Sequence, residues 1–182
     1  AMENLHKKEK LEHMNQILSD LYVRDSVTGL YNRMGYQKLS ISYFTIMREK
    51  KMPVLVMFID LDRLKYINDT FGHEYGDFAI VSIAKAMLKH CDADAIAART
   101  GGDEFIVLEG AKDEESGRVL AQKIRTELSK TQRAMQLPFD LSASIGAVVA
   151  HPGEENVLES YVKRAEMLMY EEKAEKKVSR DS

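Results

Sequence analysis

The stretch that decides the fold is Arg99-Thr100-Gly101-Gly102-Asp103-Glu104-Phe105, which lies between the apolar runs Ile96–Ala98 and Ile106–Leu108. Two short apolar runs joined by a glycine pair predict a β-hairpin whose turn contains both glycines. Neighbouring residues of a regular strand point to opposite faces, so the two acids can serve one site only where the backbone bends. Because glycine accepts positive φ and lets a ligand approach the backbone, we expect the pair to permit that bend.

The acidic turn allows two interpretations. Two carboxylates beside uncovered backbone amides suit a metal-bound phosphate. Gly-Gly-Asp is also ordinary turn chemistry, so a solvated hairpin tip without a ligand accounts for the same residues. The hairpin alone does not separate these interpretations, and the rest of the chain has to decide.

Composition limits the class of protein. A chain of 182 residues that is 45% hydrophobic and 30% charged is long enough for one domain with a core. A net charge of −3 argues against a general nucleic-acid binder, which would be basic. The single cysteine, Cys91, excludes an intramolecular disulfide and fits a reducing, cytoplasmic location. No apolar stretch approaches the ~20 residues of a membrane span, so we expect no membrane contact from this segment.

The N-terminal residues, about Glu3 to Val23, read as one polar helix. Apolar side chains recur along it at 3-4-3 spacing, the a/d pattern of a coiled coil, at Leu11, Met14, Leu18 and Leu21. An amphipathic helix folded back on its own domain has the same pattern. We expect residues 1–23 to form a stalk that joins a domain at 24–182 to an upstream sensory module.

The remaining segments alternate between helical and extended patterns. Asp25–Arg33 is a polar loop in which Asn32 is a candidate N-cap, and Val54–Ile59 is a buried strand that ends abruptly in Asp60-Leu61-Asp62. A carboxylate at the end of a buried strand is a favoured place for a ligand site. The expected helices are at about 33–50, 77–90, 114–133 and 157–176, and the expected strands at 54–59, 96–98, 106–108 and 141–149. This order predicts an α/β (α+β) domain with a central, largely antiparallel sheet flanked by helices.

Three further blocks accompany the hairpin stretch. Residues 25–33 resemble D-x-L-T-G-L-x-N-R, with Val27 in the leucine's place, and residues 60–77 resemble D-L-D-x-F-K-x-I-N-D-x-x-G-H-x-x-G-D, with Leu64 in place of the phenylalanine. Residues 165–177 resemble A-D-x-A-L-Y-x-A-K-x-x-G-R more loosely. Together with the hairpin signature, these blocks resemble the GGDEF family, the diguanylate cyclases, over roughly residues 20–177.

The resemblance implies a palm-like nucleotide cyclase fold and a specific reaction. Members of the family join two GTP molecules into cyclic di-GMP and release two pyrophosphates. Each domain holds one GTP, so a second copy of the domain must face the first in a transient homodimer. We therefore expect the chain to be the output domain of a larger signalling protein.

The resemblance also implies a metal site. Phosphoryl transfer needs positioning and charge neutralisation, and two Mg²⁺ ions, or Mn²⁺, can activate the attacking oxygen and stabilise the leaving one. The expected metal ligands are Asp60, the carbonyl of Leu61, Asp103 and Glu104. Asp103 and Glu104, with Lys65 as a phosphate-directed cation, are the expected catalytic residues, and Asp103 stands where the family is described with a proton acceptor. Alternatively, Asp60 caps the next helical segment.

Specificity for GTP is expected from a second group of residues. The carboxylate of Asp77 can accept both N–H donors of the guanine edge, which adenine lacks, although Asp77 could also be the N-cap of a helix starting at Phe78. The remaining expected GTP contacts are Asn68, His73, Gly101, Gly102, Lys173 and Lys177. The last block also departs from the family pattern, because Lys177 replaces the usual arginine and Lys176 the usual glycine.

Two further expectations concern regulation and alternatives. Many family members carry an Arg-x-x-Asp site for the product, but Asp92 and Ala95 occupy those positions here, so we expect no product inhibition through that site. The alternative to an active enzyme is a catalytically silent GTP-binding regulatory module. Silent members of the family usually lack signature acids, whereas this chain retains all of them. Cyclase activity on ATP is a third possibility, which Asp77 argues against.

Overall fold

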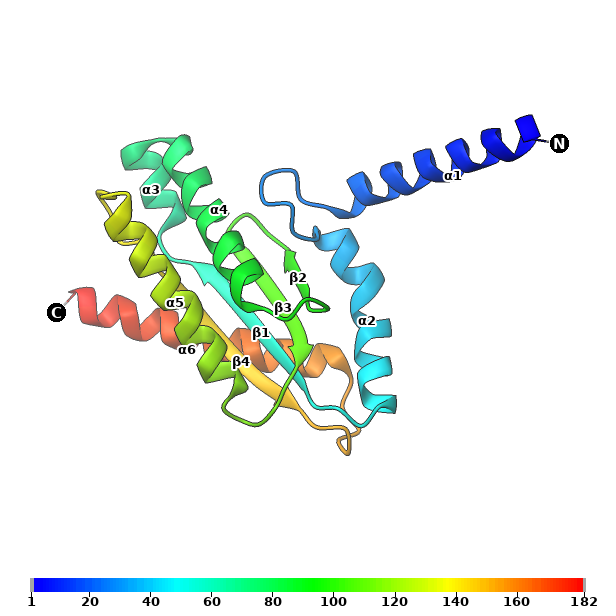
Figure 1. Ribbon diagram of the computed structural model, residues 1–182. Helices are drawn as coiled ribbons and strands as arrows, with labels where there is room; N and C mark the ends of the chain where they lie inside the picture. The colour runs from blue at the N-terminus through cyan, green and yellow to red at the C-terminus, as the bar shows by residue number, and fades with distance from the viewer. Residues whose placement is uncertain (1, 182) are drawn as a thin grey trace.

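A computed structural model describes residues 2–181, apart from the side chains of Glu3, Asp20 and Asp181. Four strands form one antiparallel sheet in the order β2-β3-β1-β4 (Figure 1): β1 (Val54–Leu61), β2 (Ile96–Arg99), β3 (Glu104–Gly110) and β4 (Ala143–Ala150). The helices are α1 (Met2–Val23), α2 (Arg33–Glu49), α3 (Leu64–Phe71), α4 (His73–His90), α5 (Ser116–Ala134) and α6 (Leu158–Asp181). The expected antiparallel α/β architecture is confirmed.

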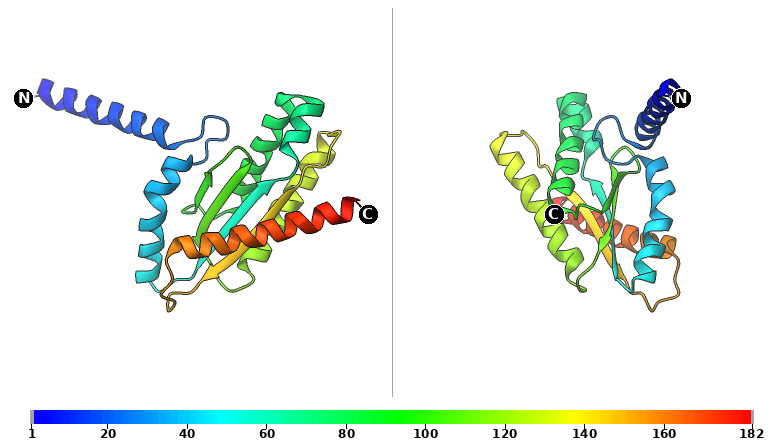
Figure 2. Two further views of the ribbon diagram at one scale, coloured as in Figure 1. Left: turned by 180° about the vertical axis from the view of Figure 1, so that it is seen from behind. Right: turned by 45° about the vertical axis from the view of Figure 1, so that its right-hand side comes forward.

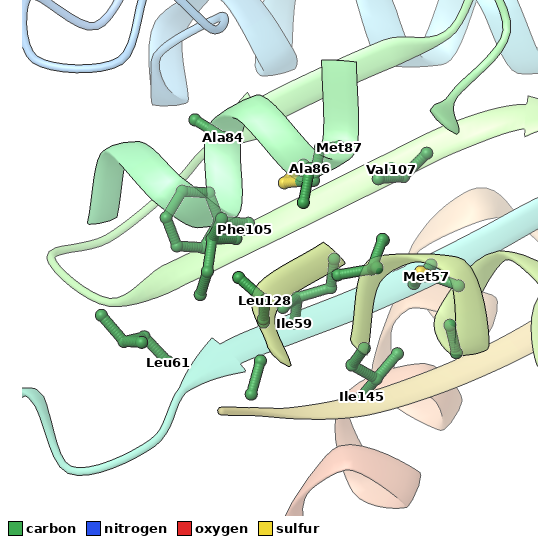
Figure 3. Close-up of a cluster of buried hydrophobic side chains, with 14 of the residues drawn as sticks. Met57, Ile59, Leu61, Ala84, Ala86, Met87, Phe105, Val107, Leu128 and Ile145 are labelled. Carbon is green, nitrogen blue, oxygen red and sulfur yellow. The ribbon is translucent and has the colours of Figure 1, made fainter. Parts of the chain in front are cut away.

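Strand β1 is buried along its whole length because helices cover both faces of the sheet. Leu55, Met57 and Ile59 pack with residues of α4 and α5 on one face of the sheet. Figure 2 shows these two helices on that face, and Figure 3 shows Met57 and Ile59 beside Leu128 and Met87. Val54, Val56 and Phe58 point to the other face and pack with α2 and α6. The side-chain period of two explains why the strand reads as a continuous apolar run.

The same alternation sets the direction of the polar residues at the end of β1. Asp60 continues the face of Phe58, which is the α6 face, whereas Leu61 belongs to the core on the α4–α5 face. Helix α6 can approach this face closely because of Gly146 on β4. A Cβ at Gly146 would lie only 1.9 Å from the carbonyl oxygen of Ala165, so any side chain would push α6 away.

Helix α1 extends away from the domain in Figure 1 and does not fold back onto it. Leu11, Leu18 and Leu21 are 59%, 59% and 71% exposed, while Val23 at its end is buried. An amphipathic helix packed on its own domain is therefore not what the structure contains. Within residues 2–181, no helix combines the length and apolarity that a bilayer span requires.

The region between β1 and α4 differs from the sequence-based expectation. Where a helical turn and a polar loop are expected before a helix at 77–90, the chain forms two consecutive helices, α3 and α4, separated by Gly72. Gly72 has φ of +98°, a backbone conformation that glycine adopts without strain. Helix α4 therefore begins at His73, four residues earlier than expected.

Candidate nucleotide and metal site

Three carboxylates meet where β1 ends beside the β2–β3 turn. Asp60 pairs with Glu104 in the sheet register, and the amide of Leu61 donates to the carbonyl of Asp103 at 2.8 Å. Oxygen atoms of Asp60, Asp103 and Glu104 all lie within 4.8 Å of one another. The turn ends where β3 begins, and the carboxylates of the two neighbouring acids lie close to each other and to Asp60. The helix-cap alternative for Asp60 is wrong, because Asp60 lies within β1.

The donor set fits a hard divalent cation. Carboxylate oxygens are ligands that Mg²⁺ prefers, and the backbone carbonyl of Leu61 stands next to Asp60 in the chain. Burial raises the pKa of Asp60, and the charges of Asp103 and Glu104 raise it further. Crowding three carboxylates together is therefore electrostatically costly, and a bound cation would relieve that cost.

Lys173 brings positive charge to the same corner. Its Nζ lies 2.7 Å from Oδ1 of Asp60, and the side chain of Asp60 is only 5% exposed. Burial opposes the charged lysine, but the hydrogen bond and charge of Asp60 outweigh it and raise the pKa of Lys173. Lys177, one turn further along α6, is exposed. Of the two α6 lysines expected to contact GTP, Lys173 is thus the one placed against the acidic cluster.

Arg99 stabilises the hairpin turn through hydrogen bonds to its backbone. Its guanidinium donates to the carbonyl oxygen of Gly102 at 2.8 and 3.2 Å and to both carboxylate oxygens of Asp25 at 3.3 Å. Asp25 also accepts from the amide and hydroxyl of Thr28. Burial raises the pKa of Asp25, but the hydrogen bonds from Thr28 and the charge of Arg99 outweigh burial and leave it lowered. The loop before α2 thereby supports the acidic turn.

The glycines of the turn act differently from the expectation. Among the described residues, positive-φ glycines are Gly29 and Gly72, so neither Gly101 nor Gly102 bends the chain in that way. A Cβ at Gly101 would lie 2.8 Å from Oε2 of Glu104, so a side chain there would displace the Glu104 carboxylate. The amide of Gly101 makes a long hydrogen bond of 3.4 Å to the carbonyl of Glu104, so it is not the uncovered donor that was expected. Gly102 is exposed.

The expected guanine contacts come from the α3–α4 pair. A Cβ at Gly76 would lie 1.8 Å from Oδ1 of Asn68, so the Asn68 amide lies directly against the residue before Asp77. Asp77 is exposed and is the fifth residue of α4; its expected alternative role as N-cap is therefore wrong. His73 begins α4 and Lys65 lies on α3, and both side chains are exposed. The structure thus places the Asn68 amide against Gly76, the residue next to Asp77 on α4.

Two polar residues near the site are absent from the sequence-based set of site residues. Asp62, 4% exposed in its side chain, binds Nζ of Lys176 at 2.9 Å and the hydroxyls of Ser142 and Ser144 at 2.8 and 2.6 Å. Burial raises the pKa of Asp62, but these hydrogen bonds and the lysine charge outweigh it and leave the pKa lowered. The signal was available, because Asp62 shares the face of Asp60 on an extended chain and Lys176 shares that of Lys173 on a helix.

Taken together, an antiparallel sheet covered by helices and a trio of acids at a strand end and hairpin turn define the palm-like fold of nucleotide cyclases. The chain belongs to the GGDEF family. The family model described as "Diguanylate cyclase, GGDEF domain" matches residues 22–179.

Individual relatives agree with this assignment. The diguanylate cyclase VdcA of Vibrio cholerae is 34% identical over 153 residues, covering 82% of this chain and 43% of VdcA. The cyclic di-GMP phosphodiesterase NbdA of Pseudomonas aeruginosa is 27% identical over 165 residues, covering 91% of this chain and 21% of NbdA. The chain therefore spans less than half the length of these relatives.

Solved structures share the fold. The coiled coil and GGDEF domain of DgcB from Caulobacter crescentus, in complex with c-di-GMP, superimposes with a TM-score of 0.78. The match covers 94% of this chain and 91% of the DgcB chain at 22% identity. At that identity, the likeness supports the fold alone.

Proposed function

We propose that this chain is a diguanylate cyclase domain that condenses two GTP molecules into cyclic di-GMP and two pyrophosphates. The observation that carries the proposal is the convergence of Asp60, Asp103 and Glu104 within 4.8 Å, with Lys173 bonded to Asp60. All three acids of the family pattern are present, in a chain that belongs to the family. An acidic hairpin tip without a ligand would have no reason to crowd these carboxylates against a buried aspartate.

In the proposed reaction, the 3′-hydroxyl of one GTP attacks the α-phosphate of another and pyrophosphate leaves. Asp60, Asp103, Glu104 and the carbonyl of Leu61 would hold Mg²⁺, two ions per site, or Mn²⁺. When bound, the metal neutralises charge on the phosphates and the attacking oxygen. The carboxylate of Asp103 accepts the proton of the attacking hydroxyl.

The remaining residues bind and orient the nucleotide. Lys65, Lys173 and Lys177 direct positive charge at the phosphates, where charge develops during transfer. Asp77 and Asn68 accept and donate hydrogen bonds at the guanine edge, with His73 beside the base or ribose. The amides of Gly101 and Gly102 line the triphosphate path, that of Gly102 being the more accessible of the two.

A second copy of the chain completes the reaction, because each domain supplies one GTP. Residues 1–23 act as a stalk and residues 24–182 as the domain. Support comes from the exposed apolar side chains of α1, Leu11, Met14, Leu18 and Leu21, which recur at coiled-coil spacing and would be covered by a second stalk. We also propose that an upstream sensory module controls this pairing in a cytoplasmic signalling protein.

The deciding experiment incubates the concentrated chain with GTP and Mg²⁺ and detects cyclic di-GMP by chromatography. The Asp103→Ala/Glu104→Ala variant is run in parallel and should form no product. Product formation should rise more steeply than linearly with chain concentration. If GTP binds but no product forms, a fused coiled coil forces dimerisation. Absence of cyclic di-GMP from the forced dimer would refute the proposal that the chain is an enzyme.

A second candidate is a silent GTP-binding module that regulates a partner. One comparison favours it: this chain matches a segment of NbdA, and NbdA is named as a phosphodiesterase rather than a cyclase. If the chain is a silent module, it should bind one GTP per chain and form no cyclic di-GMP, even when it is dimerised. The intact acidic trio favours the cyclase.

A further inference from the structure

The ammonium group of Lys176 is enclosed by acceptors from three elements. Its Nζ lies 2.7 Å from the carbonyl oxygen of Ala143, 2.9 Å from Asp62 and 3.0 Å from Glu172. An ammonium group has three N–H donors, so these three acceptors use its full capacity. With Oγ of Ser144 also 3.4 Å away, the Lys176 ammonium is committed to acceptors of the protein itself.

Asp62 depends on this charge. It is the buried residue that directly follows Leu61, and its backbone amide donates to the carbonyl of Ser142 at 2.9 Å. The hydroxyls of Ser142 and Ser144 complete the hydrogen bonding of its carboxylate. A buried carboxylate that loses its cation is costly, so Asp62 and Lys176 hold one another in place.

This pair is the second of two parallel links between α6 and the end of β1. Lys173 bonds Asp60, and Lys176, three residues later, bonds Asp62. Residues two apart on a strand and three apart on a helix share a face, so the two links are adjacent. The first link ends on Asp60, an expected metal ligand. The second ends on Asp62, which directly follows Leu61, and the carbonyl of Leu61 is a further expected metal ligand.

Glu172 extends the network to the rest of the domain. Besides Lys176, it accepts two hydrogen bonds from Arg125 on α5, at 2.8 and 2.9 Å, and one from the amide of Ile145 on the edge strand β4, at 3.0 Å. Helices α5 and α6 and strand β4 are thus tied to the point where β1 ends. A network of this extent resists movement of any single member.

We propose that Lys176 is a positioning residue of the metal site: by clamping Asp62 to α6, it fixes the end of β1 from which Asp60 and Leu61 reach the cation. The proposal rests on the proposed function for the role of that cation. Position 176 departs from the glycine of the family pattern, so the clamp is a property of this chain's own sequence. Partners outside a coordination shell commonly set metal affinity.

The test compares Lys176→Met with Lys163→Met in the full chain. Lys163 is a matched control, because it is an α6 lysine paired with a glutamate four residues earlier, like Lys176, but is 70% exposed and far along the helix from the site. Mn²⁺ binding is measured by titration of the chain without nucleotide, and the kcat and KM for GTP are measured separately. Urea unfolding verifies that each variant is folded.

We expect Lys176→Met to weaken Mn²⁺ binding by about tenfold and to lower kcat, with KM for GTP changed less than about twofold because the guanine contacts lie on α3 and α4. Lys163→Met should match the parent chain in all three quantities. Equal Mn²⁺ affinity in folded Lys176→Met and the parent would overturn the proposal. The Mn²⁺ titration needs no turnover, so failure of the proposed enzyme activity would be distinguishable.

A second variant covers the case in which Lys176→Met fails to fold. Asp62→Asn/Lys176→Met removes the buried charge together with its partner and avoids an uncompensated carboxylate. This variant should fold and show the same loss of Mn²⁺ affinity. Parent-like affinity in the double variant would refute a positioning role, and so would unfolding of both variants, because Lys176 would then serve the fold as a whole.

Discussion

Arg99 connects Asp25, at the start of the domain, to the carbonyl of Gly102 in the acidic turn. The guanidinium uses its planar set of donors for both partners at once, with N···O distances of 2.8 to 3.3 Å. Residues 74 positions apart in the chain are therefore joined by one side chain directly behind Asp103 and Glu104. The loop that follows helix α1 thereby reaches the proposed catalytic turn.

The first prediction concerns this support. Arg99→Lys removes the guanidinium fork, and a lysine cannot serve Asp25 and Gly102 simultaneously. We expect kcat to fall by about tenfold or more and the free energy of unfolding to fall by about 1–2 kcal/mol. Arg118→Lys, in an exposed pair with Glu115 on α5, is the control and should change neither quantity. Parent-like kcat in Arg99→Lys would show that the turn needs no such support.

The second prediction is a pH dependence of stability. Because the pKa of Asp25 is lowered below its ordinary value of 3.8, its ionised form stabilises the fold. That contribution is fully present above about pH 4 and is lost as the pH falls through the lower, folded-state pKa. Asp25→Asn should cost about 1–2 kcal/mol at pH 6, and the cost should shrink towards pH 3. Urea unfolding at both pH values measures this, and a cost that grows on acidification would contradict it.

The third prediction separates stability from metal binding at Asp60. The pKa of Asp60 is raised, so its ionisation at neutral pH opposes folding of the metal-free chain. Asp60→Asn should therefore raise the melting temperature measured in EDTA, yet abolish the additional stabilisation that Mn²⁺ confers on the parent chain. Differential scanning fluorimetry with and without Mn²⁺ measures both effects. A lower melting temperature in EDTA would mean that the bond to Lys173 outweighs the repulsion among the acids.

The fourth prediction concerns the choice of base. Asp77→Ser should raise KM for GTP by about tenfold or more, since a site that loses a charged hydrogen-bond partner discriminates poorly, and should gain measurable use of ATP. The fold should be unaffected because Asp77 is exposed. Glu74→Ser, one turn earlier on α4 and also exposed, is the control. Unchanged preference for GTP in Asp77→Ser would remove Asp77 from the base site.

The fifth prediction is the absence of product inhibition at the loop before β2. Asp92 occupies the position of the expected arginine, and its amide is bonded to the buried Glu109 at 2.8 Å. Burial raises the pKa of Glu109, and the negative charges of Asp92 and Asp94 raise it further. The loop thus carries two aspartates where the product site needs an arginine, and their charge repels phosphate. Isothermal titration should detect no tight cyclic di-GMP binding there. Tight binding that disappears in an Asp92 or Asp94 variant would overturn this expectation.

The sequence by itself determined the family, the antiparallel sheet and the acidic trio. Local patterns were sufficient because the apolar run before Asp60 and the runs around the Gly-Gly turn each specify a strand, and pairing of those strands brings the three acids together. The position of the first α4 turn was missed, because Gly72 separates two helices whose polar residues resemble a loop.

Only the tertiary structure decided which lysines serve which carboxylates. Lys173 and Lys176 are separated from Asp60 and Asp62 by more than a hundred residues, and their pairing depends on how closely α6 packs over Gly146. The sequence comparison made Lys176 a departure from a family glycine, whereas packing makes it the cation of a buried aspartate. Charge partners of this kind are set by the distance between elements, which no local pattern of residues encodes.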